Sequence, residues 1–369
     1  MINTQRLEEL FTSIVRLDSA SGEERQVADF ITEKLRDFGL DVREDKAAEN
    51  TGGNTGNILA RLPGKNCDGP TIMLTAHMDR VQPGKNIEPV LEDGIYRSAG
   101  DTILAADDVV GIAVILEAVN VLKEEELDHP PVELVFTVAE EVGLLGAKSL
   151  NPEDLQADMG YAFDCNGPVG NVIVKGPTHN GIQIKVRGRS AHAGVSPEEG
   201  INAIKVVSHA LSRIDQGRID GETTINIGTI KGGRARNVVP DEVDLSGEIR
   251  SQDPKRLEEE TEKMKEIFEN VAAEYEASVE FKVENLYPSF EFSSREEVVQ
   301  RCVGALKRIG REPSLQASGG GSDANIFNGK GVPTLNLATG MEKAHSTEEY
   351  LPQKELIDLG RLTLELLRV

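Results

Sequence analysis

The sequence contains no tryptophan, only three cysteines and no long apolar run. Cys67, Cys165 and Cys302 are odd in number and are not spaced as C-x-x-C, which argues against a disulfide framework and favours a reducing compartment. No apolar run approaches the roughly 20 residues that span a bilayer. The first thirty residues also lack the apolar core of a signal peptide. These features predict a cytoplasmic protein.

Positive charge is also scarce. The chain of 369 residues has 40 Lys and Arg against 63 Asp and Glu, a formal net charge of −23. Such a chain repels phosphate backbones and anionic lipids, so we expect neither nucleic acid nor a membrane as a partner. The length exceeds one ordinary compact domain and suits two domains, or one domain split by an insertion.

Short apolar runs that lead directly into polar residues recur along the chain, at 71–76, 132–139, 161–163 and 334–338. Between the first two, residues 109–122 are apolar on nearly every face and predict a buried helix. Strands that are buried on both faces and alternate with helices are typical of a parallel sheet. We therefore predict an α/β fold with a central, mostly parallel sheet.

Residues 178–289 follow a different pattern. Strands with alternating apolar residues flank a helix expected from Pro197 to Ile214 and a charged helix expected from Pro254 to about Glu276. Their order is β-α-β-β-α-β, the ferredoxin-like motif. The pattern predicts a lid domain at 178–289, inserted between two catalytic-domain segments, 1–177 and 290–369.

Polar side chains stand where the predicted strands end or where the buried helix begins. They are His77, Asp79, Asp107, Asp108, Glu140, Glu141, Asp164 and His345. Ligands of open α/β sheets bind outside the carboxyl ends of the strands, so these groups are expected to converge. Six acids at one crevice would repel each other strongly unless cations lay among them.

Two divalent ions would balance this charge and could activate water near pH 7. We hypothesise one ion held by His77, Asp107 and Asp164, and another held by Asp107, Glu141 and His345. Asp79 is placed to accept the other N–H of the His77 ring. Glu140 is then the natural general base.

Each of these residues alone also has a structural interpretation. A lone histidine at a strand end is commonly structural, and Asp-Asp before a helix is commonly an N-cap followed by a first-turn acid. Glu-Glu before Val-Gly is often a solvated turn. The functional interpretation rests on their joint occurrence at successive strand ends. A rival hypothesis is a dinucleotide site, because residues 319–324 match the motif G-x-G-x-x-A. This match is isolated and weak.

The motifs, in this order, resemble the dinuclear zinc exopeptidases that include peptidase T, aminoacylase and the carnosine-type dipeptidases, with peptidase T-like proteins the most similar. The motifs that carry the resemblance are His77-Met78-Asp79, Ala106-Asp107-Asp108 and Glu140-Glu141-Val142-Gly143. The resemblance implies metal ligands at His77, Asp107, Glu141, Asp164 and His345, a base at Glu140 and an orienting role for Asp79. It also implies a cis peptide bond after Asp107 and two metal ions, with zinc expected and cobalt or manganese as alternatives.

The resemblance extends to the lid. Gly188 to Gly194 is similar to a family motif whose histidine, here His192, reaches toward the substrate carbonyl, often from the partner subunit. By resemblance, the substrate-binding residues are Asn237, Arg250, Gly320, Gly321 and Ser322. The same comparison implies a homodimer formed through the lid.

These observations together predict a metal-dependent exopeptidase of small peptides, similar to peptidase T. The alternatives are an N-acyl amino acid amidohydrolase of the aminoacylase type and a non-catalytic binding protein on the same fold. A binding protein would be expected to lack ligands or the base, and the sequence contains all of them. The motifs do not specify peptide length or which end of the substrate is recognised.

Overall fold

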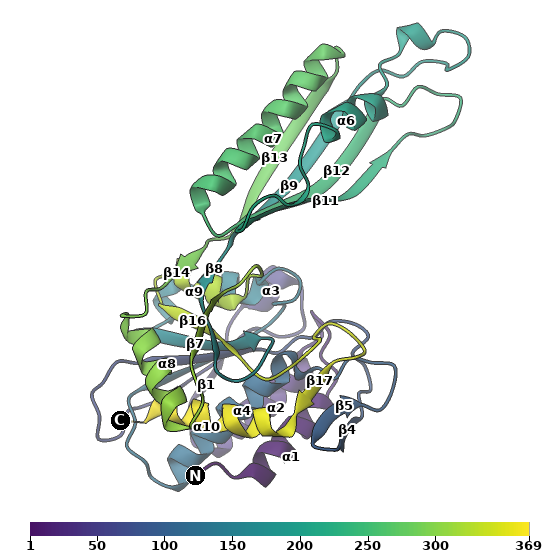
Figure 1. Cartoon of the computed structure of the whole chain (residues 1–369). Coiled ribbons are helices and arrows are strands. Elements are labelled where there is room, and N and C mark those ends of the chain that lie inside the picture. The colour runs from purple at the N-terminus through teal and green to yellow at the C-terminus, as the bar shows by residue number, and fades with distance from the viewer. Residues whose placement is uncertain (369) are drawn as a thin grey trace. The chain divides into compact units, whose positions relative to one another are not determined.

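The structure, a computed structural model, describes residues 1–368 and divides into two units (Figure 1). Unit 1 comprises residues 1–174, 291–317 and those from 322 onward, and unit 2 comprises residues 175–290 and 318–321. The predicted lid, 178–289, falls within unit 2. The short loop 318–321, which the sequence pattern placed in the catalytic domain, also belongs to unit 2. The Gln252 side chain donates to the Ser318 carbonyl at 2.9 Å, and Gly321 packs against the Tyr287 ring.

The main sheet has nine strands, and its central part is parallel. They are β1 (Val42–Glu44), β2 (Ile58–Leu62), β3 (Ile72–His77), β6 (Val132–Thr137), β7 (Met159–Cys165), β8 (Asn171–Gly176), β14 (Phe290–Glu291), β15 (Ser314–Ala317) and β16 (Thr334–Ala338). Their order is β1-β2-β6-β3-β7-β16-β8-β14, with β15 paired to β8. Strands β6, β3, β7 and β16 pair in parallel, whereas β2 and β8 join them antiparallel. The predicted mostly parallel sheet is confirmed.

Helices cover both faces of this sheet, as expected for strands that are buried throughout. They are α1 (Thr4–Val15), α2 (Arg25–Asp37), α3 (Ala47–Thr51), α4 (Ala106–Glu124), α5 (Leu145–Ser149), α8 (Glu297–Arg308), α9 (Asp323–Gly329) and α10 (Gln353–Leu367), with a 3₁₀ turn η1 (Pro152–Asp154). Figure 1 shows α1, α4 and α10 on one side and α3 and α9 on the other. A small sheet of β4 (Pro89–Glu92), β5 (Ile95–Ser98) and β17 (Tyr350–Pro352) completes unit 1.

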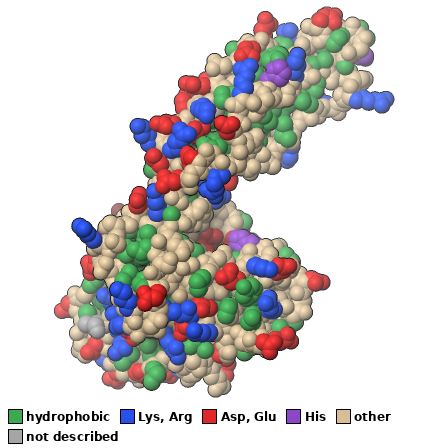
Figure 2. Space-filling model, in the orientation of Figure 1, with side chains coloured by type: hydrophobic (Ala, Val, Ile, Leu, Met, Phe, Trp, Pro, Cys, Tyr) green, Lys and Arg blue, Asp and Glu red, His purple; other side chains and the backbone are tan. Residues whose placement is uncertain are grey.

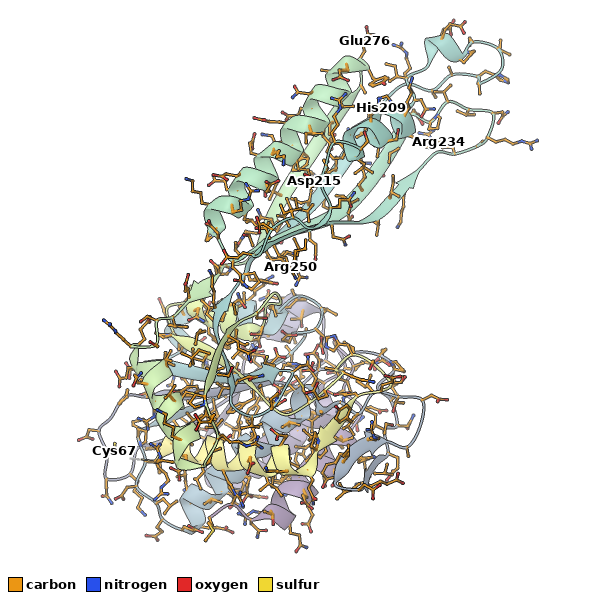
Figure 3. All side chains as sticks on the ribbon, in the orientation of Figure 1. Cys67, His209, Asp215, Arg234, Arg250 and Glu276 are labelled. Carbon is orange, nitrogen blue, oxygen red and sulfur yellow. The ribbon has the colours of Figure 1, made fainter. Side chains whose placement is uncertain are left out.

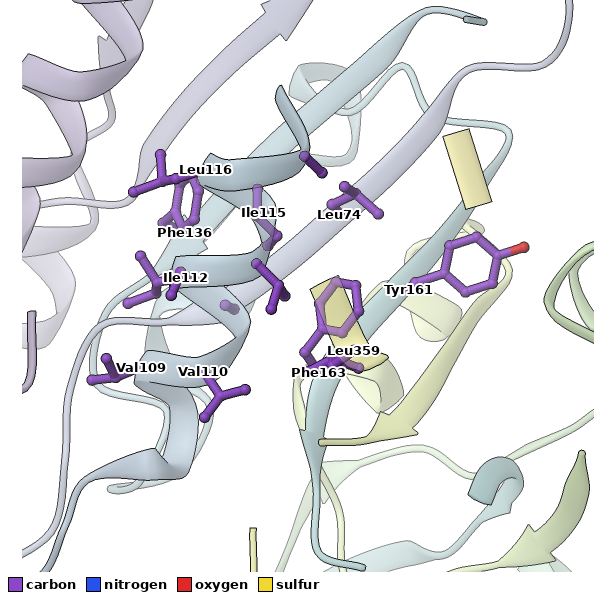
Figure 4. Close-up of a cluster of buried hydrophobic side chains, with 14 of the residues drawn as sticks. Leu74, Val109, Val110, Ile112, Ile115, Leu116, Phe136, Tyr161, Phe163 and Leu359 are labelled. Atoms are coloured by element: carbon purple, nitrogen blue, oxygen red, sulfur yellow. The ribbon is translucent and has the colours of Figure 1, made fainter. Parts of the chain in front are cut away.

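Helix α4 is the buried helix that the sequence predicts, and its packing positions the site. It packs between β3 and β7 on one side and α1 and α10 on the other. Figure 4 shows its apolar side chains beside Leu74 of β3 and Phe163 of β7. Gly111 permits the close approach to the sheet, because a Cβ there would lie 2.9 Å from the Cβ atoms of Ala76 and Phe163. The start of α4 is thereby held beside the carboxyl ends of β3 and β7.

Unit 2 is an antiparallel sheet with two helices. Its strands are β9 (Thr178–Arg187), β10 (Gly217–Arg218), β11 (Thr223–Gly232), β12 (Glu242–Ser251) and β13 (Ser278–Tyr287), in the order β10-β11-β12-β9-β13. Helices α6 (Ala203–Leu211) and α7 (Pro254–Glu274) pack on β9 and β12. Acidic and basic side chains are interspersed over the surface that carries α7 (Figure 2), and Lys263 and Lys265 pair with acids of the same helix.

The helix expected from Pro197 to Ile214 is shorter than predicted. Pro197 begins a 3₁₀ turn, η2 (Pro197–Glu199), and Gly200 is extended, so Ile201 pairs with Arg189 instead of entering a helix. The Asn202 side chain then accepts the Lys205 N–H and caps α6. No helix within residues 1–368 is both long and apolar enough to cross a membrane.

Candidate metal centre and active site

The fold brings acids and histidines from five segments of unit 1 to one edge of the main sheet. His77 is the last residue of β3, and Asp164 lies near the end of the parallel neighbour β7. Asp107 lies at the start of α4, Glu140 and Glu141 follow β6, and His345 lies in the loop after β16. The cluster forms because parallel strands present their carboxyl ends at the same edge.

The carboxylate of Asp107 lies between two imidazole rings. Its Oδ1 is 3.0 Å from Nε2 of His77, and its Oδ2 is 3.1 Å from Nε2 of His345. Asp107 is 7% exposed, and its peptide bond to Asp108 is cis, as the resemblance implies. A carboxylate that offers one oxygen to each of two ring nitrogens has the arrangement expected of a bridging ligand.

The hydrogen bonds of His77 fit a cation ligand. Its Nδ1 lies 2.9 Å from the backbone carbonyl of Asp79, which fixes the ring proton on Nδ1. In the neutral ring Nε2 then carries a lone pair that faces the Asp107 carboxylate, and two acceptors at 3.0 Å repel unless a proton or cation lies between them. Histidines that bind a metal through one ring nitrogen commonly donate the N–H of the other ring nitrogen to a carbonyl or carboxylate.

Two sets of atoms are close enough to hold an ion. Potential ligand atoms of His77, Asp107 and Glu141 all lie within 4.8 Å of one another, and so do those of His77, Glu140 and Asp164. The backbone of Asp164 is fixed by Asn336, whose side chain accepts its N–H at 2.9 Å and donates to its carbonyl at 2.7 Å. The second set includes Glu140, so this residue is within reach of the same centre as the ligands.

Glu141 supplies a further sign that an ion belongs here. Its Oε1 is buried and makes no hydrogen bond within residues 1–368, although it lies 3.0 Å from Nε2 of His345. His345 can satisfy this oxygen only while its Nε2 carries a proton, and a cation between Nε2 and the carboxylate would satisfy both groups with the ring neutral.

The cluster holds more carboxyl groups than its histidines can neutralise, and the pKa values reflect this. Burial, together with the nearby Asp164, raises the pKa of Glu140 well above its usual range. Burial and Asp107 do the same to the pKa of Asp164. Contacts with Asp107 and Glu141 raise the pKa of His345 to about 10. Divalent cations bound here would lower the pKa of these carboxyl groups, because a cation stabilises ionised carboxylates around it.

Asp79 supports the site mainly through the turn that follows β6. Its Oδ1 accepts the Glu140 N–H at 2.9 Å, and its Oδ2 accepts the Glu141 N–H at 3.2 Å and the Ser21 hydroxyl at 2.6 Å. Its carboxylate lies 3.6 Å from Nδ1 of His77, so the closer partner of that ring is the Asp79 carbonyl. Asp79 therefore connects the His77 strand to the Glu140–Glu141 turn.

Three buried acids near the centre were not identified from the sequence. The carboxylate of Glu24 accepts the N–H of Ala139 at 3.1 Å, immediately before Glu140. Asp323 accepts the Thr137 hydroxyl at 2.5 Å, and its buried Oδ1 makes no hydrogen bond within residues 1–368. Glu349 accepts three backbone N–H groups at the start of α4. The spacing of Glu349, four residues after His345, was the one available signal.

The other predicted site residues lie mainly in unit 2. His192 and Asn237 are exposed in adjacent loops, where the Ala193 N–H donates to the Asn237 carbonyl at 3.0 Å. Arg250 lies at the opposite end of unit 2 from Arg234 and Glu276 (Figure 3).

The Arg250 guanidinium is already engaged within unit 2. It makes two hydrogen bonds of 3.1 Å to Glu248, and Glu248 in turn lies 3.2 Å from Nε2 of His179. Gly320 and Gly321 also belong to unit 2, whereas Ser322 is buried in unit 1. The Ser322 hydroxyl accepts the Ala324 N–H and caps α9, which is a structural task.

Comparisons with known proteins agree with this geometry. Residues 178–276 match the family described as Peptidase dimerisation domain, and residues 57–191 match Peptidase family M28. The chain is 43% identical to the uncharacterised protein YqjE of Bacillus subtilis strain 168, covering 100% of this chain and 99% of that one.

Two solved structures match along nearly the whole length. The aminopeptidase PepT from Bacillus cereus ATCC 10987 is 42% identical, with a TM-score of 0.93 over 99% of this chain and 98% of that one. A tripeptidase from Staphylococcus aureus Mu50 is 41% identical, with a TM-score of 0.95 over 100% of this chain and 98% of that one. The chain therefore belongs to the M20/M28 metallopeptidase family, among its peptidase T-like members.

Proposed function

We propose that this protein is a metal-dependent aminopeptidase that hydrolyses tripeptides or related small peptides. The observation that carries the proposal is the Asp107 carboxylate, which offers its two oxygens to Nε2 of His77 and of His345. The similarity to a tripeptidase and to an aminopeptidase supports the substrate class.

We assign the ligands as in the sequence hypothesis, with zinc as the expected ion. One ion would be held by His77, Asp107 and Asp164, and another by Asp107, Glu141 and His345. Ions bound there would polarise the scissile carbonyl and lower the pKa of an attacking water. The groups within 4.8 Å support this assignment in part, because they join His77 with Asp107 and His77 with Asp164, although they divide the acids differently and leave out His345. The proximity of His345 to Asp107 and Glu141 supports the second set.

Glu140 is the general base and then the general acid. Its carboxylate takes a proton from the attacking water as the water oxygen bonds to the amide carbon. The same proton passes to the amide nitrogen as the C–N bond breaks, so that the amine leaves neutral. The backbone of Glu140 is fixed by Asp79, which supports a constant position for the carboxylate.

His192 is suited to donate a hydrogen bond to the carbonyl oxygen during attack. The Gly194 N–H donates to its Nδ1 at 3.2 Å, so the neutral ring carries its proton on Nε2. The exposed Nε2–H can then stabilise the negative charge that develops on that oxygen.

A peptide screen tests the proposed activity. The purified protein, loaded with zinc, is incubated with di-, tri- and tetrapeptides, with N-acetylated and C-amidated tripeptides, and with N-acyl amino acids. We expect release of the N-terminal residue from free tripeptides and little from N-acetylated ones. Preferential hydrolysis of N-acyl amino acids would instead support the aminoacylase-type alternative and refute the proposal.

We also propose that the protein forms a homodimer through unit 2. The match to a dimerisation domain supports this, and so does the edge of the unit 2 sheet. Strand β10 pairs with only Thr224 and Ile225 of β11, and from Asn226 to Gly232 that edge has no strand partner within residues 1–368. Ile230 in this stretch is 55% exposed.

Subunit mixing tests whether His192 serves the partner's site. Inactive His192→Ala and inactive Glu140→Gln proteins are mixed under conditions that exchange subunits. If His192 acts across the dimer, heterodimers contain one intact site and activity returns. A fully active monomer in sedimentation would contradict the arrangement.

A further inference from the structure

Glu349 is a buried acid whose carboxylate accepts backbone N–H groups, among them that of the proposed ligand Asp107. Its side chain is 2% exposed. Its Oε2 accepts the N–H groups of Leu104 and Ala105, each at 2.8 Å, and its Oε1 accepts the N–H of Asp107 at 3.2 Å. One carboxylate thus accepts three N–H groups from the segment that leads into α4.

The backbone of this segment is irregular, although Leu104, Ala105 and Ala106 are fully buried. Ala105 has a φ of +60°, in the left-handed region that residues with a Cβ seldom adopt. Asp107 and Asp108 depart from helical angles, and the first side-chain cap comes only at Asp108, whose Oδ1 accepts the Gly111 N–H at 3.2 Å. Buried backbone N–H groups need acceptors, and for Leu104, Ala105 and Asp107, which precede this cap, Glu349 supplies them.

The position of Glu349 in the chain adds a second connection. It lies four residues after His345, so one short segment contacts Asp107 twice, once at its side chain and once at its backbone. His345 Nε2 lies 3.1 Å from the Asp107 carboxylate, while Glu349 holds the Asp107 backbone. The direction of the Asp107 side chain relative to the two imidazoles therefore depends on both residues.

We propose that Glu349 is a positioning residue for the metal centre. It fixes the backbone from Leu104 to Asp107, so that the two oxygens of Asp107 face His77 and His345. This inference rests on the proposed function for its consequence in catalysis, but the backbone contacts exist without it. Residues that orient metal ligands typically contribute about 10- to 100-fold to metal affinity or activity.

The test compares Glu349→Gln with a matched control, Glu133→Gln. Glu133 is also a buried glutamate, 1% exposed, whose Oε2 accepts two backbone N–H groups, those of Gln156 and Ala157, at 2.9 and 3.1 Å. Its Oε1 pairs with Arg61 at 2.9 Å, and the two residues line a surface pocket that contains none of the proposed ligands. In Glu349→Gln one acceptor oxygen becomes an NH₂ group, which opposes at least one of the three N–H donors.

Two readouts are measured. In the metal-free protein, hydrogen exchange at the amides of Leu104, Ala105 and Asp107 should become about 10- to 100-fold faster at one or more positions in Glu349→Gln. Zn²⁺ affinity, measured by competition with a chromophoric chelator, should fall about 10- to 100-fold. Glu133→Gln should change neither. A second variant, Glu349→Asp, keeps an acceptor-only carboxylate and should recover part of the affinity.

Unchanged Zn²⁺ affinity in folded Glu349→Gln would overturn the proposal, whatever the exchange rates. Weaker Zn²⁺ binding with unchanged exchange at all three amides would also overturn it, because the effect would not pass through this segment. If Glu349→Gln does not fold, Glu349→Asp gives the same two readouts. Neither measurement uses a substrate, so failure of the proposed peptidase activity and failure of this inference remain distinguishable.

Discussion

Replacement of Glu140 by glutamine separates a general base from a metal ligand. The side chain is 8% exposed, and its backbone N–H is held by Asp79 at 2.9 Å, so glutamine should occupy the same place. Glutamine cannot take the proton from water. General-base catalysis contributes about 100- to 10,000-fold, and we therefore expect kcat to fall by that factor. This corresponds to about 3–5 kcal/mol in the activation free energy.

The geometry makes the outcome informative, because Glu140 is also near enough to be a ligand. Its potential ligand atom lies within 4.8 Å of those of His77 and Asp164. If Glu140 acts only as a base, the variant should bind as many metal ions as the wild type. If Glu140 is a ligand, the metal content of the variant should fall together with its activity.

The assay combines tripeptide hydrolysis with elemental analysis of the dialysed protein. Glu133→Gln is the control, because it removes a buried carboxylate elsewhere in unit 1 and should keep wild-type kcat per folded molecule. Near-normal kcat in Glu140→Gln would remove this residue from the mechanism. Loss of an ion would refute the separation of base from ligands that we propose.

Three further predictions concern stability. The Arg25 guanidinium beside Glu44 holds the pKa of that carboxyl at about 2, against an ordinary 4.5. In urea unfolding of the metal-free protein, wild type should be more stable than Glu44→Gln by at most about 1 kcal/mol, because the pair is so exposed. This difference in unfolding free energy should be present above pH 4.5 and shrink as the pH falls toward 2, and a difference that grows on acidification would contradict this. Phe268→Ala in the core of unit 2 should cost about 3–5 kcal/mol in denaturant unfolding, since the side chain is fully buried, and a cost below about 1 kcal/mol would show that the site is loosely packed. Gly111→Ala should cost about 1–3 kcal/mol because its Cβ would lie 2.9 Å from that of Ala76, and unchanged thermal stability would show that α4 can move away from the sheet.

The sequence predicts the elements whose pattern is local. Helix α4 is apolar on all faces, and β3, β6 and β16 are short apolar runs that end in polar residues, so both their type and their burial follow from composition. The convergence of His77 and Asp164 also follows, because it needs only that the strands be parallel neighbours.

Features that depend on distant contacts were not predictable in this way. Glu349 accepts N–H groups from residues more than two hundred positions away, and its spacing from His345 does not by itself identify a buried carboxylate. The loop 318–321 joins unit 2 because Gly321 packs on Tyr287. Pro197 fits the first turn of an α-helix and of a 3₁₀ turn equally well, so the late start of α6 at Ala203 depends on the pairing of Ile201.

The central claim is that two ions, held around Asp107, are needed for peptide hydrolysis. The direct test is to remove metal with a chelator, titrate Zn²⁺ into the metal-free protein, and measure both bound metal and tripeptide hydrolysis at each step. We predict that activity is absent without metal and reaches its maximum at about two ions per chain. We also predict that Asp107→Asn, which weakens a ligand shared by both sites, prevents this recovery at the same Zn²⁺ concentrations. Full hydrolytic activity in the metal-free protein, or saturation of activity by wild-type protein with a single ion per chain, would contradict the account.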